Sequence, residues 1–110
     1  MLYKNASLRL GFDGVHLFAD VGGELDHNSV GELREKTDEQ LYRVRPRMLI
    51  LNLSQVTFMD SSGLGFVVGR ARLLKELGGV VKVIGADRQT MKILTLAGLE
   101  RLPNLKIEGA

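Results

Sequence analysis

Residues 48–84 decide the fold, and they read MLILNLSQVTFMDSSGLGFVVGRARLLKELGGVVKVI. The apolar run over residues 48–52 is typical of a central strand covered on both faces. A loop through Phe58 then leads to Asp60, a good N-cap for a helix over about residues 61–77. Two glycines stop this helix, and the apolar VVKVI that follows is expected to form the next strand. The stretch therefore predicts a strand–helix–strand unit with parallel strands.

The residues before this unit predict a hairpin and a helix. Apolar residues alternate with polar or small ones over residues 8–12 and 15–21, on either side of an Asp13-Gly14 turn, as in two half-buried strands. Residues 29–32 (SVGE) fit a capping box and open a helix that runs to about Arg43. A proline three residues later ends that helix, because it biases the residue before it away from helical geometry.

The residues after the unit complete one domain. Asp87 can cap a third helix that runs to about Ala97, with Gly98 as its stop signal, and residues 105–107 can add a short last strand. The order β-β-α-β-α-β-α-β indicates an α/β layer fold, a mixed and mostly parallel sheet with helices packed against it. No repeat or linker divides residues 1–110, so we expect a single domain.

Charge and composition disfavour several partners. The 110 residues carry 15 Lys and Arg against 13 Asp and Glu, and the net charge of +2 builds little field to attract phosphates. Aromatic residues make up only 5% of the chain and Trp is absent, so a base-stacking platform is hard to build. We therefore expect no nucleic-acid partner.

Other features argue against metal, thiol and membrane roles. The chain has no cysteine, which excludes disulfides and thiolate sites, and it shows no His/carboxylate metal spacing. No apolar run approaches the ~20 residues of a membrane span, and the start of the chain lacks the apolar stretch of a secretion signal. We expect a cytoplasmic protein with no cofactor and no membrane partner.

The segment Asp60–Gly65 (DSSGLG) is the most informative part of the chain. It leaves a buried strand and enters a helix, whose start presents unpaired N–H groups and a partial positive charge. The hydroxyls of Ser61 and Ser62 therefore lie where a bound or covalent phosphate would be stabilised. The alternative is that Asp60 and Ser61 only cap the helix, since both residue types are common N-caps.

Catalytic arrangements around Ser61 fit poorly. A nucleophile elbow requires G-x-S-x-G, and Met59 occupies the place of the first glycine. A Ser61–His27–Asp26 triad requires two loops to converge, and neighbouring positions rarely aim a base correctly. The helix glycines nearly match a dinucleotide loop, but the third comes one residue late and no acidic residue follows at the required distance. We therefore expect no enzymatic activity.

The helix after Asp60 presents two apolar sides. At 100° per residue, one stripe must face the sheet, formed by Leu64, Val67, Val68, Ala71 and Leu74. Phe66 and Leu73 project to roughly the opposite side, alongside Gly65 and Gly69. Exposed apolar residues beside glycines indicate a surface that another protein approaches closely. The alternative is that the C-terminal segment folds over these residues and buries them.

With Gly23–Asp26 (GELD) before the first helix, the chain resembles a known family. Phe58–Gly65 (FMDSSGLG) and the later Gly69-Arg70 match the signature of the bacterial anti-sigma factor antagonists, which have the STAS fold. The resemblance is greatest to the sporulation antagonists of spore-forming bacteria, and it spans roughly residues 8–99.

The resemblance implies a partner-switching role in transcription regulation. In the family, the unphosphorylated antagonist binds an anti-sigma factor that is also a serine kinase, and so frees a sigma factor. The kinase uses ATP to phosphorylate the first serine after the aspartate, here Ser61, and a serine phosphatase reverses the modification. Asp26 and Asp60 match positions that flank this serine, and the helix start that meets the partner corresponds to Ser62, Gly63 and Leu64.

Two departures and two further hypotheses accompany the resemblance. Family members usually continue into a helix after the last strand, and the present sequence ends at Ala110, which would leave Phe66 and Leu73 uncovered. Residues 70–77 also differ in detail from the family pattern. One alternative is a STAS domain that senses a small ligand or nucleotide at the helix start without a phosphoswitch, and another is a serine-dependent hydrolase.

Overall fold

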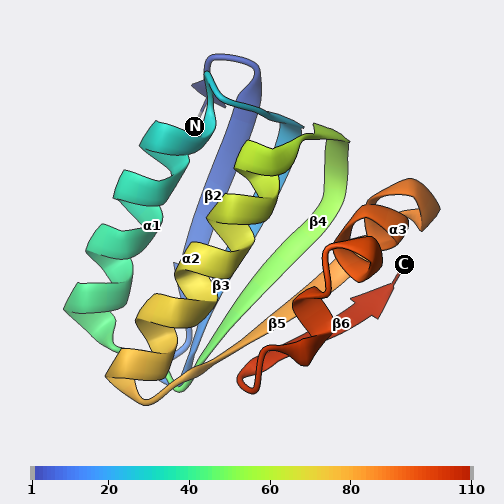
Figure 1. Cartoon of the computed structure of the whole chain (residues 1–110). Coiled ribbons are helices and arrows are strands. Elements are labelled where there is room, and N and C mark those ends of the chain that lie inside the picture. The colour runs from blue at the N-terminus through green and yellow to red at the C-terminus, as the bar shows by residue number, and fades with distance from the viewer. Residues whose placement is uncertain (1, 110) are drawn as a thin grey trace.

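The computed structural model describes residues 2–109 and confirms the α/β layer fold. The elements follow the chain as shown in Figure 1: β1 (Leu2–Tyr3), β2 (Ala6–Phe12), β3 (His16–Leu25), α1 (Val30–Val44), β4 (Met48–Met59), α2 (Ser61–Leu77), β5 (Val80–Ala86), α3 (Arg88–Leu96), the 3-10 turn η1 (Leu99–Arg101) and β6 (Leu105–Gly109). The short strand β1 and the turn η1 were not expected from the sequence.

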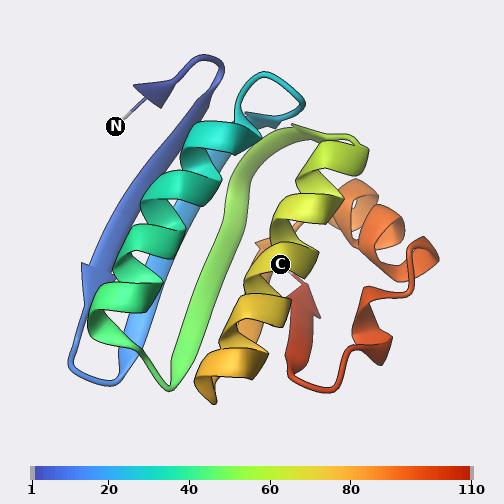
Figure 2. The same cartoon turned by 60° about the vertical axis from the view of Figure 1, so that its left-hand side comes forward.

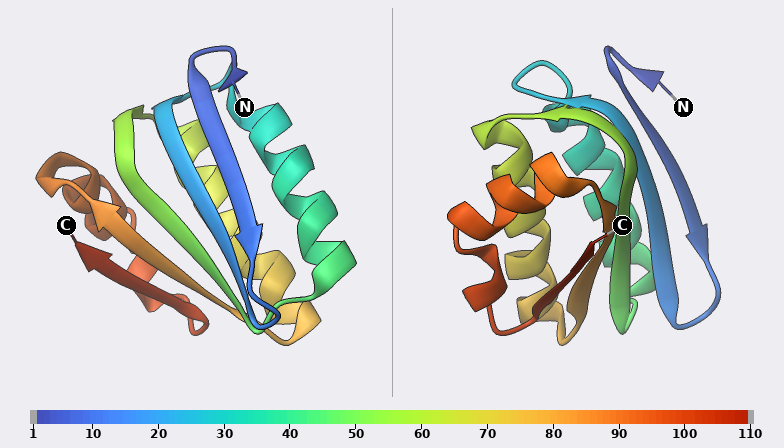
Figure 3. Two further views of the ribbon diagram at one scale, coloured as in Figure 1. Left: turned by 180° about the vertical axis from the view of Figure 1, so that it is seen from behind. Right: turned by 90° about the vertical axis from the view of Figure 1, so that its right-hand side faces the viewer.

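The strands form one six-stranded sheet whose order follows the sequence, β1-β2-β3-β4-β5-β6. The first two pairings are antiparallel, and the pairings β3–β4, β4–β5 and β5–β6 are parallel, so the mixed, mostly parallel sheet is confirmed. Each parallel pair is joined through a helix, and because such connections are right-handed and the strand order never reverses, every connecting helix lies on the same face of the sheet. Figures 2 and 3 show α1, α2 and α3 on that face and the other face open.

The prediction that the strand starting at Met48 is covered on both faces is wrong. Leu49, Leu51 and Leu53 are fully buried beneath the helices, while Ile50 and Asn52 on the open face remain half-exposed. The continuous apolar run suggested burial on both faces, but Ile50 belongs to an apolar row on the open face. Its neighbour in that row, Phe18 of β3, is also partly exposed. An apolar row on an open sheet face looks like a second core in the sequence.

The predicted loop through Phe58 is also wrong, because β4 continues to Met59. Its second half pairs with the end of β3, where Glu24 lies opposite Phe58 and Leu25 opposite Met59. The register shifts at two places along this pairing, opposite Asp20–Gly22 and Gly23–Glu24 of β3, and each time the extra residue lies in β4. This long pairing carries the ends of β3 and β4 to one edge of the sheet, where the first and second helices begin.

The hairpin turn and the helix ends follow the predicted chemistry with one exception. The Asp13 carboxylate is hydrogen-bonded to the backbone N–H and the ring of His16 and to the backbone N–H of Val15, and these bonds lower the pKa of Asp13 to about 2. Helix α1 ends at Arg45, which has a left-handed φ of 44° before Pro46. The expected capping box is absent, because the Ser29 hydroxyl donates to the Glu24 carbonyl instead of capping α1.

A single core lies between the sheet and the helices. Its largest fully buried side chains come from both the sheet and the helices: Leu17, Leu25, Leu33, Leu41, Leu49, Leu51, Leu53, Leu74, Leu94, Val21, Val67 and Val81. Among residues 2–109, no helix combines the length and the apolar character that crossing a membrane would take.

Candidate functional site

The site is the start of α2, at the carboxyl end of β4. Asp60 adopts extended backbone geometry, and its Oδ1 accepts the N–H of Ser62 at 2.7 Å and of Gly63 at 3.3 Å. The predicted N-cap is therefore confirmed. Ser61 follows as the first helical residue and is exposed, whereas Ser62 is half-buried. The hydroxyl of Ser61 is thus open to solvent at the edge of the sheet.

Asp26 lies close to this helix start because the ends of β3 and β4 are joined. The Asp60 N–H donates to the Leu25 carbonyl at 3.3 Å. The Asp26 carboxylate accepts the N–H groups of Asn28 and Ser29, so it shapes the loop that enters α1. Ser29 is fully buried and holds this loop against the end of β3. The structure therefore brings Asp26 and Asp60 to the same edge of the sheet.

Gly63 and Leu64 pack against the sheet and the core of the domain. A Cβ at Gly63 would lie 2.5 Å from Cγ of Met59 and 2.9 Å from the Leu25 carbonyl oxygen, distances that real Cβ atoms do not reach. Leu64 is half-buried against the core. Gly63 is therefore needed for close packing of α2 on the sheet, and its contact with a partner, which the family resemblance implies, stays a prediction.

The expectation that Phe66 is exposed is wrong. Phe66 is only 3% exposed, because α1 packs against this side of α2. Arg70 lies over its ring at 5.2 Å from the centroid, and the Arg70 guanidinium also donates to the Phe66 carbonyl. Phe66, on the side opposite the sheet stripe, is thus covered by the first helix and not by the C-terminal segment.

Leu73, Gly65 and Gly69 lie along the same flank of α2 with different exposure. Leu73 is half-buried against the core, Gly65 is exposed and Gly69 is half-exposed. A Cβ at either glycine would meet nothing within 4 Å. Neither glycine is needed for packing within the chain, although each one weakens a helix interior by roughly 1 kcal/mol relative to alanine.

An ion pair that was not expected from the sequence joins α1 and α2. Arg70 is 5% exposed, its Nε lies 2.7 Å from Oδ1 of Asp38, and its Nη2 donates to Oδ2 at 3.2 Å. Burial raises the pKa of Asp38 above its usual range although Arg70 opposes this, and burial lowers the pKa of Arg70. The available signal was the position of Arg70, one helical turn after Phe66 on the α1 side.

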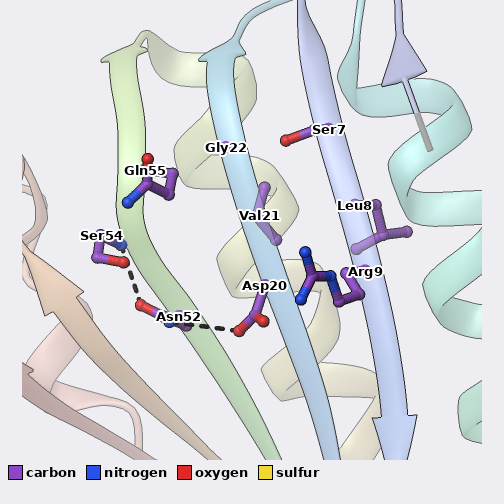
Figure 4. Close-up of a pocket in the computed structure, with 9 residues that line it drawn as sticks. All are labelled: Ser7, Leu8, Arg9, Asp20, Val21, Gly22, Asn52, Ser54 and Gln55. Carbon is purple, nitrogen blue, oxygen red and sulfur yellow. Dashed lines mark hydrogen bonds between the residues drawn. The ribbon is translucent and has the colours of Figure 1, made fainter.

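A pocket of about 340 Å³ hollows the open face of the sheet, the face opposite the helices (Figure 4). The Asn52 amide bridges Asp20 and the Ser54 N–H, and Gly22 leaves the middle of the pocket without a side chain. Polar side chains dominate the lining, which consists of Ser7, Leu8, Arg9, Asp20, Val21, Gly22, Asn52, Ser54 and Gln55. Ser61 is not part of it.

The catalytic triad is not assembled. Within residues 2–109, no hydrogen bond links His27 to Ser61 or to Asp26, and the Asp26 carboxylate is occupied by backbone N–H groups. No group of three His, Cys, Asp or Glu side chains in this part of the chain could hold a metal ion. What this edge of the sheet offers is the exposed Ser61 next to the helix cap Asp60, with Asp26 at the end of the neighbouring strand β3.

Comparison with known proteins places the chain in a family. Residues 10–108 match the STAS domain. The chain is 34% identical to the anti-sigma F factor antagonist of Paenibacillus polymyxa over 86 residues, which cover 78% of this chain and 74% of that one. It is 33% identical to the anti-sigma-B factor antagonist of Staphylococcus aureus over 82 residues, or 74% and 75% of the two chains.

Solved structures agree with these similarities. The unphosphorylated form of the anti-sigma factor antagonist SpoIIAA superposes with a TM-score of 0.80 at 27% identity, over 94% of this chain and 88% of the other. The phosphorylated form of the Bacillus protein superposes with a TM-score of 0.74 over 94% and 91%. The resemblance inferred from the DSSGLG segment is confirmed, and the chain belongs to the STAS domain family.

Proposed function

We propose that this chain is an anti-sigma factor antagonist regulated by phosphorylation of Ser61. The unphosphorylated form binds an anti-sigma factor that is also an ATP-dependent serine kinase, and thereby releases a sigma factor. Phosphorylation ends the binding, and a serine phosphatase restores it. The similarity to antagonists whose solved structures include unphosphorylated and phosphorylated forms carries the proposal.

The geometry at the start of α2 supports Ser61 as the phosphate acceptor. Ser61 is exposed, and the N–H groups of Ser62 and Gly63 are already paired with the Asp60 carboxylate. A phosphate on Ser61 therefore gains little from the helix N-terminus and stays next to a carboxylate, directed to solvent. A partner that covers this edge meets the full added charge, and like-charge contact across an interface costs several kcal/mol.

The open glycines support the flank of α2 as the surface that the partner covers. Gly65 and Gly69 lie four residues apart, one turn of the helix, and neither has a neighbour that a methyl group would strike. A partner backbone can approach closely there. Leu73 adds part-buried apolar area, while Phe66 supports the surface from below.

The alternative, a STAS domain that senses a ligand at the helix start, receives less support. The pocket on the open face does not reach the helix start, and the pocket between α1 and α2 reaches it through Ser62 and Gly65 but not through Ser61. A phosphoswitch is the function that an exposed serine at this position fits best.

Phosphorylation with a cognate kinase and ATP, followed by intact mass and tandem mass spectrometry, tests the proposal. We expect the parent protein to gain one phosphate on Ser61. Ser61→Ala removes the modification, whereas the matched control Ser62→Ala retains it. No phosphate on the parent protein, or most of it on Ser62, contradicts the proposal.

The role of the glycine flank has its own test. Gly65→Ala is expected to stabilise α2, raising the melting temperature by several degrees, while it weakens binding to the anti-sigma factor. Gly11→Ala is the matched control, because Gly11 is also exposed with open space around it but lies on the far face of the sheet. Unchanged binding by Gly65→Ala would place the interface elsewhere.

A further inference from the structure

A groove runs between α1 and α2 beside the phosphorylatable edge of the sheet. It has a volume of about 270 Å³, and its lining combines apolar, hydroxyl and cationic groups: Val30, Arg34, Ser62, Gly65, Phe66 and Arg70. We name it the α1–α2 groove. The half-buried Ser62 and the exposed Gly65 lie on its α2 side, so the groove adjoins the flank that the proposed function assigns to the partner.

The charges in the α1–α2 groove do not balance. Both carboxylate oxygens of Asp38 are engaged by the buried Arg70. Arg34, one turn before Asp38 on α1, is exposed, and in residues 2–109 its side chain makes no hydrogen bond or ion pair. Burial lowers the pKa of Arg70, the negative charge of Asp38 raises it, and the positive charge of Arg34 lowers it further. Two arginines thus share one carboxylate, which leaves one cation unpaired.

We propose that the α1–α2 groove receives an acidic side chain of the anti-sigma factor, whose carboxylate pairs with Arg34 and accepts a hydrogen bond from the Ser62 hydroxyl. This inference rests on the proposed function. A carboxylate matches the missing charge, and an arginine fork is well suited to pair with it. The open space at Gly65 leaves room for the backbone that carries the acidic residue.

A phosphate on Ser61 is not expected to fill the groove, because Ser61 does not line it and lies about 100° from Ser62 around the helix. The acidic group in the groove therefore comes from the partner. The arrangement also links binding to the switch. A carboxylate seated in the groove lies within the same small area as a phosphate on Ser61, so the two negative charges oppose one another when both are present. Release on phosphorylation then follows from repulsion between the phosphate and the acidic residue that Arg34 attracts.

Calorimetry with the ADP-bound anti-sigma factor of the source organism tests the inference with three variants. We expect Arg34→Gln to weaken binding about tenfold and Arg34→Glu to weaken it further. Lys36→Glu is the matched control, because Lys36 is exposed on α1 but does not line the groove, and we expect it to bind nearly as the parent does. We expect the difference in affinity between the parent and Arg34→Gln to become smaller as the salt concentration rises. Thermal melts of all variants establish that each is folded, and Arg34→Gln avoids placing a second acid beside Asp38.

The outcomes separate the inference from the proposed function. If the parent protein does not bind the anti-sigma factor, the proposed function fails and the inference fails with it. If the parent binds and the folded Arg34 variants bind as Lys36→Glu does, only the inference is overturned. It is also overturned if Arg34→Gln leaves binding unchanged but raises the pKa of a phosphate on Ser61, measured by ³¹P NMR, since Arg34 would then serve the phosphate.

Discussion

Helices α2 and α3 both begin with an aspartate N-cap, but only α2 has the features of a functional site. Each follows a parallel strand, and each has an aspartate N-cap whose carboxylate accepts backbone N–H groups, Asp60 for α2 and Asp87 for α3. Two serines follow Asp60, and Gly65 and Gly69 leave one flank of α2 without side chains, whereas Arg88 follows Asp87. The aspartate alone therefore carries no functional information. The exposed hydroxyl at the next position and the open glycine flank distinguish α2.

The two helices also differ in how firmly they are anchored, and the largest effect we predict tests this. Phe66→Ala removes a ring that is 3% exposed, and we expect it to lower the free energy of unfolding by about 3–5 kcal/mol. Leu96→Ala on α3, where the side chain is 79% exposed, should change it by less than about 0.5 kcal/mol. Urea unfolding measures both. Similar small losses would mean that Phe66 is exposed, as its sequence pattern first suggested.

The two caps should differ in strength. Asp60→Ala removes an acceptor of two N–H groups, and we expect a loss of about 1–2 kcal/mol. Asp87→Ala removes a carboxylate that accepts the Thr90 N–H at an exposed site, and it should lower the melting temperature less. Thermal denaturation compares them. An equal or larger effect of Asp87→Ala would contradict the view that α2 is the more firmly capped helix.

Phosphorylation at the start of α2 should leave the fold intact. The favourable effect of a negative charge near a helix N-terminus is opposed by Asp60 and Asp26, so we expect the melting temperature to stay within a few degrees of the unmodified value. Melting curves and near-ultraviolet circular dichroism of the phosphorylated protein measure this. Loss of cooperative melting would show that the switch works by unfolding.

The smallest effect concerns acid stability at the start of α3. Backbone and side-chain hydrogen bonds from Thr90 favour the charged carboxylate and lower the pKa of Asp87. A lowered folded-state pKa gives stability that is present above the unfolded value, about 3.9, and is lost as pH falls through the folded value. The parent should therefore lose stability below about pH 4 faster than Asp87→Asn does. Acid unfolding of the two proteins measures this, and an equal loss of stability with falling pH in both would refute it.

Much of this comparison could be predicted from the sequence, because local chemistry decides it. Asp60 and Asp87 as caps, the stop at Gly78 and the bend before Pro46 depend on the residues themselves. The surroundings of Phe66 could not be predicted in this way. A helical wheel identifies the stripe that faces the sheet, but whether α1 also covers the next side depends on how two helices pack.

The same limit applies to β4 and to the α1–α2 groove. We expected a loop in the second half of β4, but it is a strand, and it pairs with the end of β3. The pairing of Arg70 with Asp38 joins residues 32 positions apart, and the unpaired charge of Arg34 is apparent only once that pairing is known.

Isothermal titration calorimetry with the anti-sigma factor and ADP, comparing the unmodified protein with the protein phosphorylated on Ser61, tests the central claim most directly. We expect the unmodified protein to bind and the phosphorylated protein to bind at least about 100-fold more weakly, since like-charge contact costs several kcal/mol. Ser61→Asp, with one charge and fewer acceptor oxygens, should fall between them. Equal affinity of the two forms, with both folded, would contradict a switch at the start of α2.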